Sequence, residues 1–234
     1  MSLREIVLDT ETTGFDPKAN HRIVEIGCVE LVNHLPTGQT FHRYVNPQRD
    51  MPEEAQKVHG LTSEFLSTQP VFADIVDEFL AFIGDAPLVI HNAEFDLNFI
   101  DAELGWLNRP ALDRGRAIDT VHLARRKFPG APASLDALCA RFSIDNSSRT
   151  LHGALLDAQL LAEVYLELIG GRQVTIDLTV ASGPASVAAA RAERPRRVPR
   201  PHQPTPDEIA AHAALLQQLK APIWLDGVGS DAKG

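Results

Sequence analysis

The sequence predicts an α/β protein with helices on the faces of a five-stranded mixed sheet and a flexible C-terminal tail that ends in a short helix. Three extended apolar segments come first, and from residue 87 onward short strands alternate with helical patterns. This order is typical of a mixed sheet covered by helices. The composition changes after residue 171, which separates a folded domain, 1–171, from three tail segments, 172–180, 181–204 and 205–234.

The first three strands are predicted from apolar runs and turn residues. Residues 3–9 contain a short apolar run that indicates a buried strand, and residues 22–33 form a longer one. Residues 35–38 include a proline and a glycine and are expected to turn the chain into a third strand, 40–45. The first half of the sheet should therefore contain a hairpin.

The remaining elements are predicted from apolar periodicity and capping residues. Thr62 and Ser134 are expected as helix N-caps, and Pro70 opens the longest of the early helices. Strands are expected at 87–90 and 117–119, and helices at 52–57, after Thr62, and at 70–83, 94–107, 120–128, 134–142 and 154–169.

The composition indicates a globular protein of the cytoplasm. Of the 234 residues 44% are hydrophobic and 23% are charged, and no apolar run approaches the length of a membrane span. The chain runs at once into its first strand, so no signal peptide is expected. Two cysteines support neither a disulfide framework nor a thiolate metal site.

The charge is unevenly distributed. The net charge is −9, of which residues 1–170 contribute −11 and residues 171–234 contribute +2. A domain that held nucleic acid by bulk electrostatics would be basic. If the substrate is nucleic acid, metal ions must neutralise charge locally and a partner could supply the grip.

Asp9 and Glu11 lie two residues apart at the end of the first strand. Side chains alternate along a strand, so both carboxylates point to the same face. Such a pair is costly near a core unless a positive charge lies between the two groups, and a divalent cation with oxygen ligands would meet that need. The alternative is a solvated strand end followed by a Thr-Gly turn.

Two further acids lie on apolar helix faces. Asp96 and Asp157 each precede apolar residues at positions i+3 and i+4, which places each acid on the core side of its helix. An acid favoured by the helix N-terminus is the alternative explanation for Asp96. Four core-facing carboxylates in one fold are most simply explained by a site for two hard cations.

His152 lies five residues before Asp157, in a loop next to Gly153. A loop histidine on its own is usually solvated. Beside a metal–carboxylate cluster, however, an imidazole with an ordinary pKa near 6.5 is a candidate general base for water.

These residues carry a resemblance to a known family. The three exonuclease motifs of the DEDD superfamily, in the variant with histidine in the third motif, are matched in order by Asp9-x-Glu11, Asp96 and His152-x-x-x-x-Asp157. The chain also resembles the proofreading epsilon subunits of bacterial DNA polymerase III, in the stretches Asp9–Gly14, Val58–Thr62 and His91–Asp96. The resemblance covers residues 3–170 and resumes in the C-terminal segment.

The resemblance implies a ribonuclease H-like fold and 3′→5′ removal of nucleotides from a single-stranded or frayed DNA end. It implies two Mg²⁺ or Mn²⁺ ions, one activating the attacking water and the other stabilising the departing 3′ oxygen. The metal ligands would be Asp9, Glu11, Asp96 and Asp157, with His152 as base and with substrate contacts from Thr12, His59, His91, Asn92 and Phe95. Phe95 could equally be a core residue at a helix start, and His59 could lack a role in binding.

The segment after the folded domain is similar to the Gln-led peptides by which replication proteins bind a sliding clamp. Gln173 would lead this peptide, and Ile176 and Leu178 would fill an apolar pocket. Many such peptides have an aromatic residue where this chain has Leu178. The alternative is simply the start of an extended tail.

The last segment contains a second predicted docking element. A linker rich in proline and arginine leads to a capping box, Thr205-Pro206-Asp207-Glu208, and to a helix with one apolar stripe. Pro206–Leu225 resembles the epsilon region that binds the polymerase alpha subunit, so Ile209, Leu216 and Trp224 are the predicted contacts. Packing of this helix on the chain's own core is the alternative.

Two other functions would also use parts of this sequence. A free-standing DEDD exonuclease of the ribonuclease T or oligoribonuclease type would use the same residues on RNA ends, but it would not need the tail. An adaptor for clamp and polymerase with a vestigial nuclease site is less consistent with a complete catalytic set. Whether a further small subunit joins is open.

Overall fold

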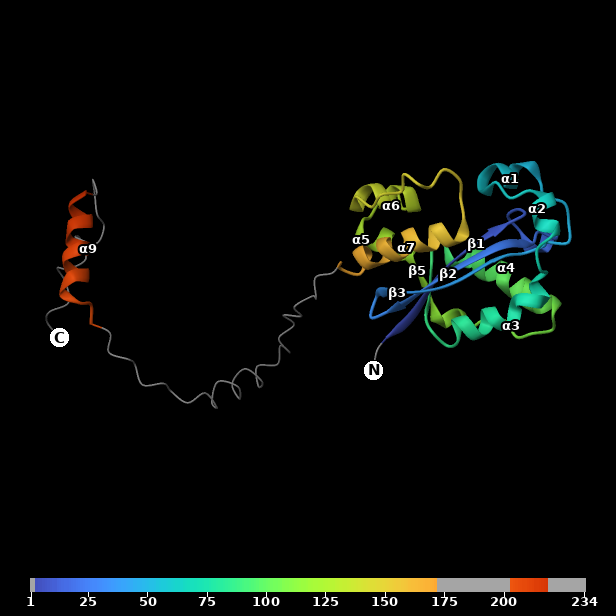
Figure 1. Cartoon of the computed structure of the whole chain (residues 1–234), viewed down its shortest axis with the longest axis horizontal. Helices are drawn as coiled ribbons and strands as arrows, with labels where there is room; N and C mark the ends of the chain where they lie inside the picture. Colours follow the sequence, from blue (N-terminus) through green and yellow to red (C-terminus); the bar gives the residue numbers. More distant parts are fainter. Residues whose placement is uncertain (1–2, 172–202, 219–234) are drawn as a thin grey trace. The chain divides into compact units, whose positions relative to one another are not determined.

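The computed structural model describes residues 3–171 and 203–218. The first of these ranges forms an α/β domain, as predicted (Figure 1). Its sheet has five strands in the order β3-β2-β1-β4-β5. The β1–β2 and β2–β3 pairs are antiparallel, and the β1–β4 and β4–β5 pairs are parallel. The predicted mixed sheet is therefore confirmed.

The strands alternate their side chains between two apolar cores. The five strands are β1 (Arg4–Thr12), β2 (Ile23–Val32), β3 (Leu35–Tyr44), β4 (Leu88–Ile90) and β5 (Ala117–Asp119). On β1, Ile6 and Leu8 belong to one core and Val7 to the other, and all three are fully buried. Because side chains alternate along a strand, the sheet lies between the two cores, with β1 as its central strand.

Each core is closed by its own set of helices (Figure 1). The core of Ile6 and Leu8 is covered by α3 (Phe72–Ile83) and α4 (Ala93–Trp106). The core of Val7 is covered by α5 (Thr120–Lys127), α6 (Leu135–Phe142) and α7 (Ala154–Leu168). The shorter helices are α1 (Glu53–His59), α2 (Ser63–Ser67), η1 (Pro17–Ala19) and η2 (Arg114–Arg116).

The hairpin between β2 and β3 differs from the prediction. The turn is formed by Asn33 and His34, which both have positive φ, and not by residues 35–38, which are part of β3. A two-residue hairpin turn of type I′ has positive φ at both positions, and asparagine tolerates that conformation. Gly38, with φ +87°, lies where the β2–β3 register shifts, so the predicted turn glycine lies instead at an irregularity of the strand pair.

A close approach between β2 and α7 positions the end of that helix. A Cβ atom on Gly27 would lie 2.3 Å from the backbone of Ala154 and Leu155. Only glycine allows this distance, so Gly27 lets the first turn of α7 rest against the sheet. Asp157 lies in that turn.

The second described range contains helix α9 (Pro206–Gln218). The predicted capping box is present: Glu208 Oε2 accepts from the Thr205 N–H at 2.8 Å, and the Glu208 N–H donates to Thr205 Oγ1 at 3.3 Å. Ile209, one of the predicted polymerase contacts, is exposed. No helix in residues 3–171 or 203–218 is long and apolar enough to cross a bilayer.

Several predicted positions lie outside the described residues. They are the linker, the clamp peptide with Gln173, Ile176 and Leu178, and the polymerase contact Trp224.

Candidate active site

A cleft of about 650 Å³ opens where the C-terminal end of β1 meets the first turns of α4 and α7. The cleft collects residues that are far apart in sequence. All of the predicted catalytic, metal and substrate residues in the described domain line it except Asn92. The sheet order explains this convergence, because the adjacent parallel strands β1 and β4 end at the same edge.

Asp9 and Glu11 project from the end of β1 into this cleft. Asp9 lies opposite Gly27 of β2, and Glu11 lies opposite Glu25. Glu25 is itself buried and lies 2.7 Å from His42 Nε2. The strand end therefore carries more negative charge than the predicted pair alone.

Asp96 reaches the cleft from the first turn of α4. Its Oδ1 atom accepts from the Thr10 N–H at 3.0 Å and from the Thr10 hydroxyl at 2.7 Å. The side chain is buried. These bonds hold the carboxylate against β1 at Thr10, the residue between Asp9 and Glu11.

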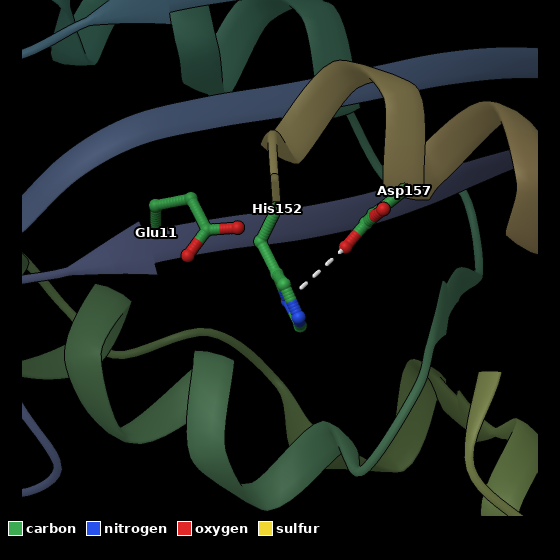
Figure 2. A group of neighbouring side chains, drawn as sticks. All are labelled: Glu11, His152 and Asp157. Atoms are coloured by element: carbon green, nitrogen blue, oxygen red, sulfur yellow. Dashed lines mark ion pairs between the residues drawn. The ribbon is translucent and has the colours of Figure 1, made fainter. Parts of the chain in front are cut away.

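Asp157 and His152 approach Glu11 from the start of α7 (Figure 2). These three residues offer ligand atoms that all lie within 4.8 Å of one another. His152 Nδ1 lies 3.6 Å from Asp157 Oδ2, and the imidazole is 48% exposed while Asp157 is buried. The histidine is therefore near the carboxylates and still accessible to water.

Burial raises the pKa values of Asp9, Glu11 and Asp96, and neighbouring carboxylates add to the effect. Burial, followed by the charges of Asp157 and Glu25, raises the pKa of Glu11 to about 8. Burial also raises the pKa of Asp96 to about 7, against the hydrogen bonds from Thr10. The pKa of Asp9 is well above its usual value because of burial and the neighbouring carboxylates.

The donor set fits a hard divalent cation. A cation that prefers oxygen ligands reduces the repulsion between buried carboxylates. Mg²⁺ and Mn²⁺ both have this preference. The raised pKa values of Glu11 and Asp96 are what burial without a directly bonded positive charge produces. Asp9, Glu11, Asp96 and Asp157 could thus hold metal ions here.

Arg149 is a site residue that was not predicted from the sequence. Its Nε and Nη2 atoms donate to the two oxygens of Asp157 at 2.6 and 2.7 Å. It also donates to Asp136 Oδ1 at 2.8 Å and lies 3.0 Å from His152 Nδ1. The signal was available, because a buried carboxylate group requires a positive charge, and an arginine lies three residues before the candidate base.

His59 carries an unused hydrogen-bonding atom. Its Nδ1 accepts from the Leu61 N–H at 3.1 Å, and its Nε2 is buried without a partner. Burial lowers the pKa of His59, which favours the neutral ring, and because Nδ1 accepts, the proton of that ring lies on Nε2. A ligand oxygen in the cleft could accept from this donor, which would otherwise remain unsatisfied at a cost.

His91 and Asn92 lie at the junction of β4 and α4. His91 Nδ1 lies 2.8 Å from Thr120 Oγ1, and burial lowers the pKa of the ring. Asn92 has φ +64° and an exposed side chain, and it serves as the N-cap position of α4. Asp119 accepts from the N–H groups of Asn92 and Ala93, each at 3.3 Å, which fixes this junction.

Three further side chains form the walls of the cleft. The Thr12 hydroxyl donates to the Gly14 carbonyl at 2.6 Å. Phe95 packs on Phe99 with ring centroids 5.1 Å apart, so it is both a core residue and a cleft residue. Phe15, which was not predicted, lines the cleft with 87% of its surface exposed. Exposed aromatic side chains in such a place can stack on bases.

The family and its relatives are consistent with this geometry. A family model described as Exonuclease, of the RNase_T type, matches residues 6–165. The chain is 49% identical over 223 residues to the DNA polymerase III subunit epsilon of Rickettsia conorii, covering 93% of this chain and 97% of that protein. It is 46% identical over 229 residues to the Escherichia coli protein of the same name, covering 93% of each.

The fold also resembles that of a solved structure. The nuclease domain of 3′hExo, a DEDDh family member bound to rAMP, superposes with a TM-score of 0.62 and 18% identity, covering 72% of this chain and 92% of that one. This likeness confirms the expected ribonuclease H-like fold.

Proposed function

This chain belongs to the DNA polymerase III epsilon subunits of the exonuclease family, the proofreading 3′→5′ exonucleases of that polymerase, and on that premise we propose how its cleft acts. The observation that carries the proposal is the convergence of four carboxylates and His152 in one cleft. Neither the tail nor the composition alone would distinguish a nuclease from an adaptor.

The exonuclease family implies divalent metal ions, and two of them, Mg²⁺ or Mn²⁺, are proposed for this cleft. Asp9, Glu11, Asp96 and Asp157 would hold them. Bound there, the ions would make water more acidic and stabilise charge on the departing 3′ oxygen. Hydrolysis of the last phosphodiester bond would release a nucleoside 5′-monophosphate.

His152 is proposed as the general base. Its ring is half exposed and lies beside Asp157 at the mouth of the cleft, where a water molecule can reach it. A neutral imidazole can accept the proton of the attacking water near neutral pH. Because His152 lies next to Glu11 and Asp157, it could instead bind a metal ion. The experiment below distinguishes a base from a ligand.

The terminal nucleotide is proposed to bind beside the carboxylates. His59 Nε2 offers a buried N–H donor, and Phe95 offers an apolar surface. His91 and Thr12 line the same cleft. The contact by Asn92 remains a prediction that the position of its side chain does not favour.

The family and the negative charge of the domain indicate which partners the chain needs. As an epsilon subunit the chain associates with DNA polymerase III and acts on DNA. The acidic domain favours weak binding of free DNA, so a partner should supply the grip. We propose that Pro206–Leu225 binds the alpha subunit and that residues 173–178 bind the sliding clamp, through Gln173, Ile176 and Leu178.

The test compares three purified proteins: wild type, Asp9→Ala and His152→Ala. In Mn²⁺ the wild type should release nucleotides from the 3′ end of single-stranded DNA. Both variants should lose about 100-fold or more in rate, since general bases and metal ligands each contribute at least that much. Calorimetric titration should show lost Mn²⁺ binding for Asp9→Ala and retained binding for His152→Ala.

Each outcome decides a separate point. A folded Asp9→Ala protein with wild-type turnover would refute the metal assignment. Loss of Mn²⁺ binding in His152→Ala would make His152 a ligand and not the base. Faster degradation of an RNA oligomer of the same sequence would favour the ribonuclease type of enzyme over a DNA proofreader.

A further inference from the structure

Arg149 occupies the place in the cleft where positive charge is required. Its guanidinium spans both oxygens of Asp157 at 2.6 and 2.7 Å and reaches Asp136 on α6. Only 8% of this side chain is exposed. A planar fork with two parallel N–H donors matches a carboxylate better than any other side chain does.

We propose that Arg149 is the resident counter-cation of the cleft and that divalent metal displaces it from Asp157, so that Arg149 sets the affinity of the site for metal. The inference rests on the proposed function, which makes Asp157 a metal ligand. It adds a competitor for that ligand from within the chain.

The two occupants of Asp157 oppose each other. Both carboxylate oxygens already accept from Arg149, and a cation that took either oxygen would lie within a few ångströms of the guanidinium. Two positive charges at such a separation repel strongly in a cleft that is partly shielded from water. Binding of metal at Asp157 should therefore require Arg149 to move.

The same residue also engages the proposed base. Arg149 Nη2 lies 3.0 Å from His152 Nδ1, and because a guanidinium has only donors, the imidazole nitrogen must be the acceptor. That lone pair is then unavailable to water. Displacement of Arg149 would free a ligand carboxylate and a base nitrogen in one step.

The surrounding loop does not depend on the Arg149 side chain for its backbone hydrogen bonds. Its backbone is held by bonds that do not use the guanidinium, from the Arg149 N–H to the Asn146 carbonyl at 3.0 Å and from the His152 N–H to the Val58 carbonyl at 3.0 Å. Asp136 Oδ1, which also accepts from Asn146 Nδ2 at 3.1 Å, keeps a second anchor for Arg149 on the cleft wall.

The test titrates the full-length chain with Mn²⁺ alone by calorimetry. Arg149→Gln should bind Mn²⁺ about 5-fold or more tightly than wild type, the usual size of a coupling between two sites. Arg149→Lys should lie between the two, because one ammonium keeps the charge but cannot span both oxygens of Asp157. Arg114→Gln is the control: it makes the same charge change at a surface pair with Asp101, outside the cleft lining.

Thermal unfolding supplies the second measurement. In EDTA, Arg149→Gln should melt below wild type because Asp157 loses its partner, and in saturating Mn²⁺ the two should melt together. If Arg149 were only a structural brace, the variant would melt lower in both conditions and its affinity for Mn²⁺ would not rise.

Either unchanged or weaker Mn²⁺ binding by Arg149→Gln would overturn the inference. Failure of the wild type itself to bind Mn²⁺ through Asp9 would instead refute the metal centre of the proposed function. The two failures are thus distinguishable in one set of titrations.

Discussion

Without a metal ion, full ionisation of the buried carboxylates in the cleft is unfavourable at neutral pH. Glu11 and Asp96 have pKa values of about 8 and about 7, so below those pH values the folded protein holds protons that the unfolded chain releases near pH 4. In the absence of metal ions, bound protons neutralise part of the carboxylate charge. Metal ions and protons should therefore compete for these oxygens.

This competition predicts how stability depends on pH. A raised pKa in the folded state stabilises the fold at low pH, and this contribution is lost as the pH rises through the folded pKa. In EDTA, the free energy of unfolding should fall between about pH 6.5 and pH 8, by at most about 1.4 kcal/mol per pH unit for each proton released. The lowered pKa values of His59 and His91 oppose this trend only at the lower end of the range, because their effect fades as the pH rises above the unfolded histidine value near 6.5.

Thermal denaturation across that pH range, in EDTA and in excess Mg²⁺, measures the effect. Mg²⁺ should raise the melting temperature more at pH 8 than at pH 6.5. Glu11→Gln should flatten the EDTA curve, since it removes one of the groups that titrate. A wild-type curve in EDTA that rises or stays level over this range would contradict the prediction.

At the scale of secondary structure, the position of α7 decides whether Asp157 and His152 reach the cleft. Gly27 on β2 permits the contact, because a Cβ atom there would lie 2.3 Å from the helix backbone. The sequence shows a glycine in a strand, but it does not show which element approaches that glycine. Only the packing of α7 on β1 and β2 gives this residue its role.

We expect Gly27→Ala to push α7 away from the sheet. The overpacking should cost about 1–3 kcal/mol of unfolding free energy, and the shift of Asp157 should weaken Mn²⁺ binding. Urea denaturation and calorimetric titration measure the two effects. Gly105→Ala is the matched control, because no atom lies within 4 Å of a Cβ there, and in helix α4 it should be neutral or stabilise by up to about 1 kcal/mol. Equal stability of the two variants would show that the approach at Gly27 is not tight.

At the scale of the whole molecule, catalysis and partner binding are expected in separate parts of the chain. Residues 3–171 contain the complete cleft, and α9 lies in a separate compact unit. Helix α9 is a short helix with exposed apolar residues, Ile209 and Leu215, and helices of this length are marginal alone in water. A partner surface would stabilise it.

Deletion of residues 205–234 should therefore spare nuclease activity and abolish co-elution with the alpha subunit in gel filtration.

Two single substitutions test the apolar stripe itself. Ile209→Asp places a charge on the stripe, and Gln217→Asp adds the same charge at a polar position as a control. Only the first should weaken the complex. Co-elution of the truncated chain at the wild-type level would exclude the C-terminal segment as the tether.

The sequence alone determined the fold class, the order of the elements and the four carboxylates and the histidine that line the cleft. Those features depend on local periodicity, on capping and on a few side-chain types whose spacing is readable along one chain. The capping box at Thr205 and the strand at 117–119 were predictable for this reason. The β2–β3 turn was not, because Asn33 and His34 compete there with a Pro-Gly tract that carries a stronger turn signal.

Only the tertiary structure decided what compensates the charge of the cleft. Arg149 is eight residues from Asp157 in sequence, and its partners Asp136 and His152 come from a different helix and a loop. Glu25 and Gly27 likewise acquire their importance from residues across the sheet and from α7. Electrostatic and steric effects of this kind depend on distances through space, which the order of residues along the chain does not specify.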